Sequence, residues 1–249
     1  MKIDILTLFP KMFENVLGES MLKRARNKGC VDIKVHNLRD WTSDNHRTAD
    51  DKPFGGGPGM VMKVEPVCRA LKSLAANRDK RRLGMKSSSK ISEPRVILLT
   101  PQGKRLEQKD VRRLAKYKRL VLICGHYEGV DERIRNFADD EISIGDYILT
   151  CGEIPAMALI DSVVRLIPGS LGSKESLDSE SFEKNLLEYP QYTRPAQYLG
   201  MKVPDVLLSG DHKRIEEWRN KEAMKRTAER RPDMLKKLRK PTRPTRSGW

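Results

Sequence analysis

Short apolar runs alternate with amphipathic segments along the first two thirds of the chain. Runs such as residues 96–99 and 120–123 are typical of strands buried on both faces, and the segments between the runs have helical periodicity. This alternation predicts an α/β fold with a parallel sheet. The expected strands are residues 2–8, 31–35, 96–99, 120–123 and 141–144, and the expected helices are residues 11–27, 64–74, 108–116, 130–137 and 153–166.

Glycine, proline and serine mark where these elements should end. Gly29 would cap the first helix in a left-handed conformation, and Pro155 fits the first turn of a helix because its missing N–H costs little there. Residues 78–95 are polar and without periodicity, which predicts a mobile insertion. Residues 169–181 have the composition of a linker. The expected domains are an α/β domain at 1–168, a flexible linker at 169–185 and a smaller helical domain at 186–249.

Three glycine-bearing turns each follow an apolar run: PQG at 101–103, CGHYEG at 124–129 and IGDYILTCGE at 144–153. In open α/β sheets, ligands bind beyond the carboxyl ends of the strands. Gly125 and Gly152 would let the backbone approach a ligand closely, although each alone also fits an ordinary turn. The clustering of the three turns predicts the functional site. Two other phosphate-binding patterns are excluded, because residues 6–13 lack the GxGxxG glycines and residues 50–60 lack the GK[ST] ending of a P-loop.

The composition and charge of the chain exclude several classes of protein and favour others. The four cysteines form no CxxC pair and the four histidines form no HExxH, so neither a disulfide framework nor a zinc site is indicated. No run of eighteen apolar residues and no signal sequence is present, so we expect a cytoplasmic protein without a membrane partner. The net charge of +15 favours a polyanionic partner. Fourteen Lys and Arg against five Asp and Glu between residues 213 and 246 predict contact with nucleic acid.

Seven strings, in order along the chain, carry a family resemblance: IDILTLFPKMF, DDKPFGGGPGM, LLTPQGKRL, LICGHYEGVDERI, ISIGDYILTCGEIPAMALID, YPQYTRP and VPDVLLSGDHKRIEEWR. Over nearly its whole length the chain resembles the bacterial tRNA (guanine-N1)-methyltransferases, the TrmD family of SPOUT methyltransferases. The resemblance implies a deep trefoil knot, an exception to the rule that chains do not thread their loops. It also implies S-adenosylmethionine as methyl donor, tRNA as substrate, and a homodimer with active sites at its interface.

The resemblance further implies that S-adenosylmethionine binds in the knot, with its adenine held by backbone groups of residues 144–149. Glu128 would contact the amine of the cofactor or help to hold a magnesium ion. The cofactor-binding residues implied are Leu98, Leu99, Thr100, Pro101, Gly103, Gly125, Tyr127, Glu128, Gly129, Ile144, Gly145, Asp146, Tyr147, Ile148, Leu149, Gly152 and Pro155.

The implied reaction methylates N1 of the guanosine at position 37 of tRNA, next to the anticodon. N1 carries a proton in neutral guanine, so a general base must remove it. The family's linker aspartate aligns with Glu180, and Asp178 lies two residues upstream, so both remain candidates for the base. Arg165 matches an arginine that would stabilise negative charge on the guanine, but it would equally suit the negative end of a helix dipole.

Besides Glu180, two positions depart from the family pattern: His126 stands where arginine is common, and Cys151 replaces the first glycine of TGGE. We expect an ordinary backbone angle at Cys151, because a Cβ at positive φ costs about 1 kcal/mol or more. Redox control by Cys151 is a further hypothesis. The alternative function is a non-catalytic RNA-binding or ribosome-associated protein of the same fold. The expected RNA-binding residues are Asp50, Gly59, Arg194, Lys213, Arg214 and Arg219.

Overall fold

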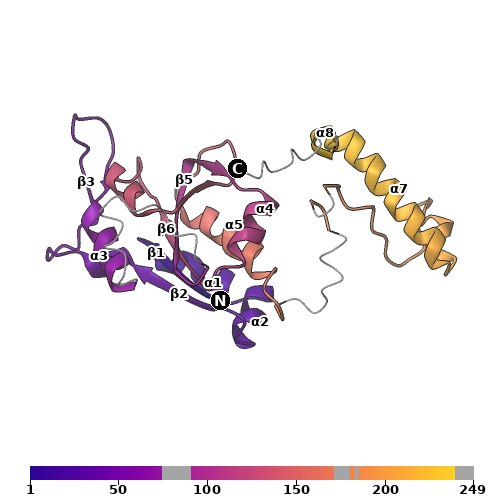
Figure 1. Cartoon of the computed structure of the whole chain (residues 1–249), viewed down its shortest axis with the longest axis horizontal. Helices are drawn as coiled ribbons and strands as arrows, with labels where there is room; N and C mark the ends of the chain where they lie inside the picture. Colours follow the sequence, from indigo (N-terminus) through magenta and orange to yellow (C-terminus); the bar gives the residue numbers. More distant parts are fainter. Residues whose placement is uncertain (75–90, 171–179, 183–184, 239–249) are drawn as a thin grey trace, which may run out of the picture. The chain divides into compact units, whose positions relative to one another are not determined.

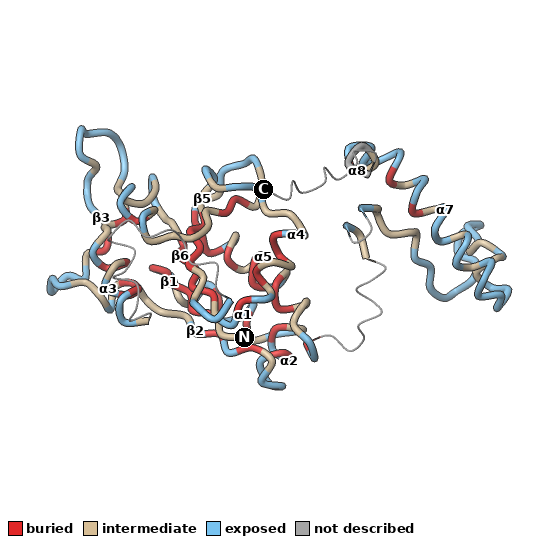
Figure 2. The backbone as a smooth tube through the Cα atoms, viewed as in Figure 1, coloured by how far each residue is buried: buried red, intermediate tan, exposed pale blue. Residues whose placement is uncertain are grey.

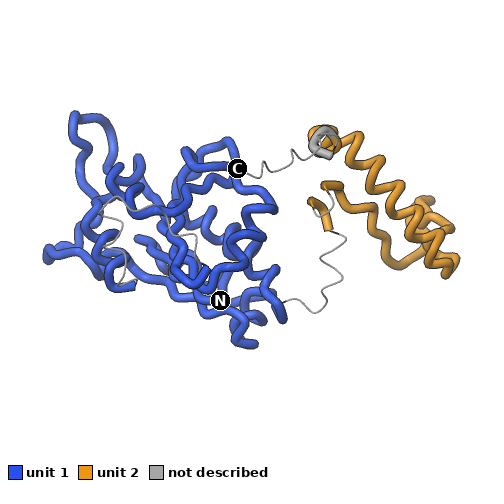
Figure 3. Tube along the Cα trace, viewed as in Figure 1, with its two compact units in different colours: residues 1–172 blue, residues 173–249 orange. Residues whose placement is uncertain are grey.

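The computed structural model describes residues 1–74, 91–170, 180–182 and 185–238 (Figure 1). The chain divides into two compact units, Met1–Gly172 and Ser173–Trp249 (Figure 3), and each is considered by itself. Most of the expected insertion at 78–95 and the candidate base Asp178 lie outside the described residues.

The first unit is built on a sheet of five parallel strands in the order β2-β1-β6-β5-β7. All five expected strands are present, and the α/β prediction with a parallel sheet is confirmed. A separate pair of short antiparallel strands, β3 and β4, was not expected from the sequence. The strands are β1 (Lys2–Thr7), β2 (Asp32–Asn37), β3 (Asp50–Asp51), β4 (Val61–Met62), β5 (Arg95–Arg105), β6 (Arg119–Cys124) and β7 (Asp140–Ser143).

Helices cover both faces of the sheet, which explains why its strands are apolar on both sides. Within β5, Ile97 and Leu99 join the core on the side of α5, whereas Val96 and Leu98 join the core on the side of α3. Figure 1 shows α3 on one side of the sheet and α4 and α5 on the other, and Figure 2 shows the buried residues concentrated in the strands and in α5. The helices are α1 (Glu14–Leu17), α2 (Ser20–Asn27), α3 (Val64–Leu74), α4 (Gln108–Leu114) and α5 (Glu153–Val164).

The local predictions fail at three places. The helix expected over 11–27 is divided into η1 (Pro10–Phe13), α1 and α2, with the break at Gly18. The helix expected over 130–137 is the 3-10 helix η4 (Glu132–Phe137), which starts where Asp131 accepts a hydrogen bond from the Arg133 N–H at 2.9 Å. The turn expected at 101–103 is instead part of β5, which continues beyond a shift of register against β7.

The expected end signals are confirmed: Gly29 has a φ of 70°, and Pro155 lies in the first turn of α5. Gly103 has a structural reason to be glycine, since a Cβ there would lie 2.5 Å from the Glu141 carbonyl carbon of the adjacent strand. The absence of a side chain lets the two strands β5 and β7 stay paired beyond the irregularity.

The second unit is described by its own packing. The long helix α7 (His212–Arg230) begins at Asp211, whose side chain accepts a hydrogen bond from the Arg214 N–H at 3.1 Å. Thr227 is buried on this helix and its hydroxyl accepts a hydrogen bond from the Leu187 N–H at 2.8 Å. In the part of the chain that the structure describes, no helix has the length and apolar character needed to cross a bilayer. The other elements of this unit are β8 (Gln197–Tyr198), β9 (Met201–Lys202), η5 (Asp205–Leu208) and α8 (Pro232–Leu238), and the first unit also contains η2 (Leu38–Trp41).

A buried carboxylate joins three adjacent strands. Asp4 of β1 is fully buried and accepts hydrogen bonds from His36 Nε2 of β2 and from Arg119 Nε of β6, each at 2.8 Å. Burial by itself raises the pKa of Asp4, but these two hydrogen bonds and the charge of Arg119 outweigh burial, so the net pKa is lowered. The ionised form of Asp4 therefore stabilises the folded state.

Replacing Asp4 with Asn tests this contribution. We expect Asp4→Asn to lower the free energy of unfolding at pH 7 by about 3 kcal/mol, because it leaves a partly buried guanidinium without its anion. The contribution is present above the unfolded pKa of about 3.9 and is lost as the pH falls through the lower folded pKa. Urea unfolding at a series of pH values should therefore show the two proteins converging below pH 4. A constant difference down to pH 2 would contradict this account.

Candidate active site

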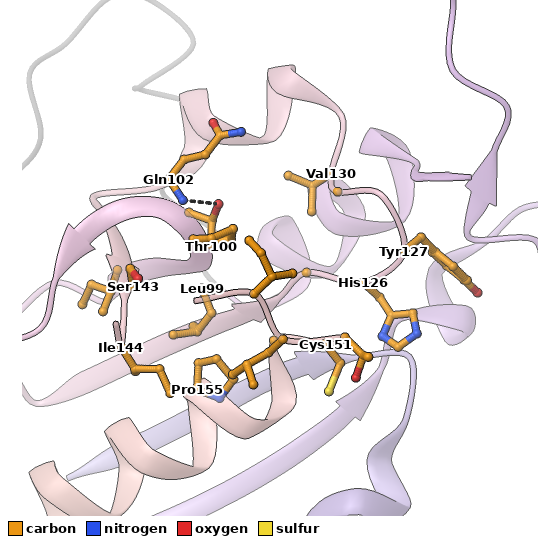
Figure 4. A pocket seen from close by; sticks show the side chains of 18 of the residues that line it. Leu99, Thr100, Gln102, His126, Tyr127, Val130, Ser143, Ile144, Cys151 and Pro155 are labelled. Atoms are coloured by element: carbon orange, nitrogen blue, oxygen red, sulfur yellow. Dashed lines mark hydrogen bonds between the residues drawn. The ribbon is translucent and has the colours of Figure 1, made fainter. Parts of the chain in front are cut away.

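A cavity of about 400 Å³ lies against the middle of β5 and the carboxyl ends of β6 and β7, beside the first turn of α5. Its size is in the usual range for small-molecule sites. Three backbone segments that are distant in sequence form its walls, namely residues 99–102, 125–130 and 142–152. Figure 4 shows side chains from all three segments, such as Leu99, His126 and Ile144, gathered around one space.

Most of the expected cofactor-binding residues line this one cavity. They come from all three of the glycine-bearing segments that the sequence singled out. The structure therefore brings together positions that are more than fifty residues apart along the chain. The expected residues that line the cavity are Leu99, Thr100, Pro101, Gly125, Tyr127, Glu128, Gly129, Ile144, Gly145, Tyr147, Ile148, Leu149, Gly152 and Pro155.

Three expected residues do not line the cavity. Leu98 is fully buried in the core on the α3 side, because neighbouring residues of a strand face opposite sides of the sheet. Gly103 lies against β7, as described above. The side chain of Asp146 is largely exposed and lies 3.7 Å from Arg105.

The cavity has further lining residues that were not expected to bind a ligand. Arg135 reaches the cavity from η4 and donates hydrogen bonds to Gln102, Glu132 and Glu141. Gln102 belongs to β5 and Glu141 to β7, so Arg135 connects η4 to both of these strands. No pattern in the sequence relates η4 to the other two strands. The residues that sequence reasoning did not assign to the ligand are Gln102, His126, Val130, Glu132, Arg135, Ile142, Ser143, Thr150 and Cys151.

The closest contact between cavity walls involves Gly152. Its N–H donates a hydrogen bond to the Gly125 carbonyl oxygen at 2.7 Å. A Cβ at position 152 would lie 2.6 Å from the Gly125 nitrogen and 2.9 Å from the Cys124 Cα, so no larger residue fits without moving backbone. Cys151, the neighbouring departure from the family pattern, is not among the described residues with positive φ, which confirms the expectation of an ordinary backbone angle there.

Polar groups are buried directly beneath the cavity. Glu153, the first residue of α5, is fully buried, and its Oε1 accepts a hydrogen bond from the Thr7 hydroxyl at 2.5 Å. His126 Nδ1 lies 3.9 Å from Glu153 Oε2. Burial, with a smaller contribution from the charge of Glu153, raises the pKa of the Cys124 thiol well above its ordinary value. Cys124 is therefore a protonated core residue and not a nucleophile.

A glycine-rich loop joins β3 to β4 and adjoins one wall of the cavity. The Glu128 N–H donates a hydrogen bond to the Met60 carbonyl oxygen at 3.1 Å, and the Met62 N–H donates to the Gly129 carbonyl oxygen at 3.0 Å. Gly59, one of the expected RNA-binding residues, packs against the Glu128 side chain with no room for a Cβ. Asp50, the other expected residue of this loop, pairs with Met62 across the hairpin.

The remaining expected RNA-binding residues belong to the second unit. Arg194, Lys213 and Arg214 are exposed, as is Arg219, whose guanidinium lies 4.9 Å from the centre of the Tyr189 ring. An arginine stacked on an aromatic ring keeps its charge available to a polyanion.

The expected catalytic residues are absent from the cavity lining. Arg165 follows the last residue of α5, whereas Gly152 precedes the first, so the length of the helix places the two about 20 Å apart. Glu180 belongs to the second unit, and Asp178 lies outside the described residues. Among the residues that the structure describes, no group of three or more His, Cys, Asp and Glu side chains could hold a metal ion.

Comparison with known proteins gives a consistent result. A family model described as tRNA (Guanine-1)-methyltransferase TrmD matches residues 1–237. Three similar curated relatives are each named tRNA (guanine-N(1)-)-methyltransferase. The protein of Geobacillus kaustophilus is 56% identical over 94% of this chain and 91% of its own length, that of Dictyoglomus turgidum is 54% identical over 95% and 91%, and that of Bacillus subtilis is 54% identical over 95% and 93%.

The contact at Gly152 is tested by two matched substitutions. We expect Gly152→Ala to lower the free energy of unfolding by about 2 kcal/mol, because its methyl group would overlap rigid backbone atoms. Gly125→Ala is the control, since a Cβ there meets nothing nearer than 3.4 Å, and it should cost less than about 1 kcal/mol. Urea unfolding of both variants measures the difference. Equal effects would show that the contact between the two segments is not tight.

Proposed function

The chain belongs to the tRNA (guanine-1)-methyltransferase family TrmD, and we propose that S-adenosylmethionine, the methyl donor of this family, binds in the cavity beside α5. The enzyme methylates N1 of guanine in tRNA. The observation that carries the proposal is the cavity itself, which the three glycine-bearing segments form together. The proposed target is the guanosine at position 37.

The residues of the cavity suit this cofactor. The contact of Gly152 with Gly125 creates a backbone cradle that a Cβ would fill. Leu99 and Pro155 supply apolar walls, and residues 144–149 present backbone groups that can hydrogen-bond to an adenine. The buried Oε2 of Glu153, which has no hydrogen-bond partner, places a negative charge beneath a site for a positively charged ligand.

When bound, S-adenosylmethionine supplies an electrophilic methyl group on a sulfonium. The protein must position the guanine and remove the proton from its N1. We propose Glu180 as the general base and retain Asp178 as the alternative, since both lie in the segment that matches the family's linker. Arg165 would stabilise the negative charge that develops on the base ring as N1 loses its proton.

We further propose that the catalytic groups act in the cavity of a second copy of the chain. The distance along α5 keeps Arg165 away from the cavity of its own unit. Exposed apolar side chains on neighbouring elements offer an interface, and one of them, Phe9, lies 4.6 Å from the His126 ring at the cavity. A symmetric dimer through this surface would complete two sites. The exposed apolar residues are Phe9, Met12, Val16 and Ile154.

A trefoil knot is part of this proposal. The segment after β7 returns to the end of β6, where Cys151 forms an isolated bridge with His126 and Gly152 bonds to Gly125. These contacts support a threaded path, because the chain must pass the β5 segment to reach them.

The tRNA would be bound by both units. The exposed cations of the second unit, Arg194, Lys213, Arg214 and Arg219, can neutralise phosphates. Asp50 and Gly59, beside the cavity wall, are placed to contact a base drawn out of the anticodon loop. Glu128 could hold a magnesium ion together with oxygen atoms of the ligands. Because tRNA is used in the cytoplasm, we propose that the enzyme works there.

Substitution of the two linker carboxylates identifies the base. We expect Glu180→Gln to slow single-turnover methyl transfer to a tRNA transcript with guanosine at position 37 by roughly 100-fold or more, because the N1 proton then has no acceptor. Asp178→Asn is the matched control and should retain most of the activity. The reverse pattern would move the base to Asp178, and a transcript with adenosine at position 37 should accept no methyl group from the wild type.

Mixed dimers test whether Arg165 and Glu180 act in the same cavity. When Arg165→Ala and Glu180→Gln chains are mixed, each mixed dimer contains one chain of each kind. If both groups that act in a cavity come from the partner chain, each cavity receives one intact and one defective group. We therefore expect mixing to restore no activity. Recovery toward a quarter of the wild-type rate would contradict this arrangement. It would mean that Arg165 acts in the cavity of its own chain and Glu180 in the cavity of the partner chain, so that one cavity of each mixed dimer has both groups intact.

A further inference from the structure

Glu153 is a buried carboxylate directly beneath the cavity. Its side chain is fully buried at the first position of α5, between Gly152 and Pro155, which both line the cavity. Glu153 itself is not part of the lining. Any influence on a ligand must therefore act through the cavity floor.

The two oxygens of Glu153 have different surroundings. Oε1 accepts the hydrogen bond from Thr7, while Oε2 and the facing His126 Nδ1 are both buried without a hydrogen-bond partner. The separation of 3.9 Å between these two atoms is too long for a hydrogen bond. Among the described residues, no Lys or Arg forms a salt bridge with Glu153.

The buried charge therefore lacks a full counter-charge within the protein. A buried carboxylate is costly unless a cation or several hydrogen bonds compensate for it. The N-terminus of α5 compensates in part, since the helix dipole is positive there. The unpartnered Oε2 faces His126, which lines the cavity, so a cation in the cavity would complete the compensation.

We propose that Glu153 favours the cationic methyl donor over the neutral product of the reaction. This inference rests on the proposed binding of S-adenosylmethionine in the cavity. During transfer the bond between sulfur and methyl carbon breaks, its electron pair stays on sulfur, the methyl group joins N1, and the N1 proton goes to the linker carboxylate. The sulfur changes from a cation to a neutral thioether, so the attraction to Glu153 disappears and S-adenosylhomocysteine leaves more easily.

Thr7 offers a matched control for the structural role of Glu153. Thr7→Val keeps the volume of the side chain and leaves the charge in place, but removes the hydrogen bond to Oε1 and the one that the Thr7 hydroxyl accepts from the Phe9 N–H. Glu153→Gln keeps the shape and removes the charge. Glu153→Met is a second neutral variant that needs no hydrogen bond and replaces the carboxylate with a buried apolar chain of similar length.

Calorimetric titration of the full-length protein with S-adenosylmethionine and S-adenosylhomocysteine at pH 8 tests the proposal. We expect the preference for the cation, taken as the Kd of S-adenosylhomocysteine divided by the Kd of S-adenosylmethionine, to fall roughly tenfold in Glu153→Gln and in Glu153→Met. Thr7→Val should leave this ratio unchanged, even where it weakens both ligands equally.

The outcomes separate the inference from the function on which it rests. Equal weakening of both ligands in the neutral Glu153 variants would overturn the inference and leave Glu153 as a structural residue. A wild type that binds neither ligand would overturn the proposed cofactor site itself. A ratio that falls only in Thr7→Val would show that the hydrogen bond, and not the charge, discriminates between the two ligands.

Discussion

The close approach of Gly152 to Gly125 is the constraint on which the site depends. It holds the segment after β7 against the segment after β6, with a hydrogen bond of 2.7 Å and no space for a Cβ. The same contact sets the start of α5, because Gly152 is the residue before its first turn. One backbone contact therefore joins a cavity wall, the start of α5 and the end of β6.

Buried and half-buried acids have two different roles in the first unit. Asp4 is paired with Arg119 and His36, and Asp140 is held by two guanidinium groups, those of Arg95 and Arg113. Burial raises the pKa of Asp140, but these hydrogen bonds outweigh it and the net pKa is lowered. Asp4 and Asp140 thus each join neighbouring elements, and the negative charge of each carboxylate has a cationic partner. Glu153 has no such partner, and it is the one of these acids that lies beneath the cavity.

The length of α5 separates Arg165 from the cavity. The end of α5 that adjoins the cavity and the end that leads to Arg165 are separated by the whole helix. A helix is stiff over this length, so Arg165 stays away from the cavity at the other end of α5. The proposed pairing of two copies would bring an Arg165 to each cavity, and exposed apolar side chains on η1, α1 and α5 are available for such an interface.

Sequence alone determined much of this picture. Apolar periodicity located the five parallel strands and the helix α3, since burial on both faces demands continuous apolar runs, and the motif strings identified the family. Periodicity did not show the break at Gly18, where the N–H closes the last turn of α1 onto Glu14 and Asn15. It also did not show the continuation of β5 past Gly103, because that depends on pairing with β7. Only the tertiary structure showed that the Leu98 side chain packs on the α3 face of the sheet and that Arg135 lies at the cavity. It also brought His126 beside Glu153. The order of residues along the chain does not show which distant groups meet, because that depends on how the backbone packs in three dimensions.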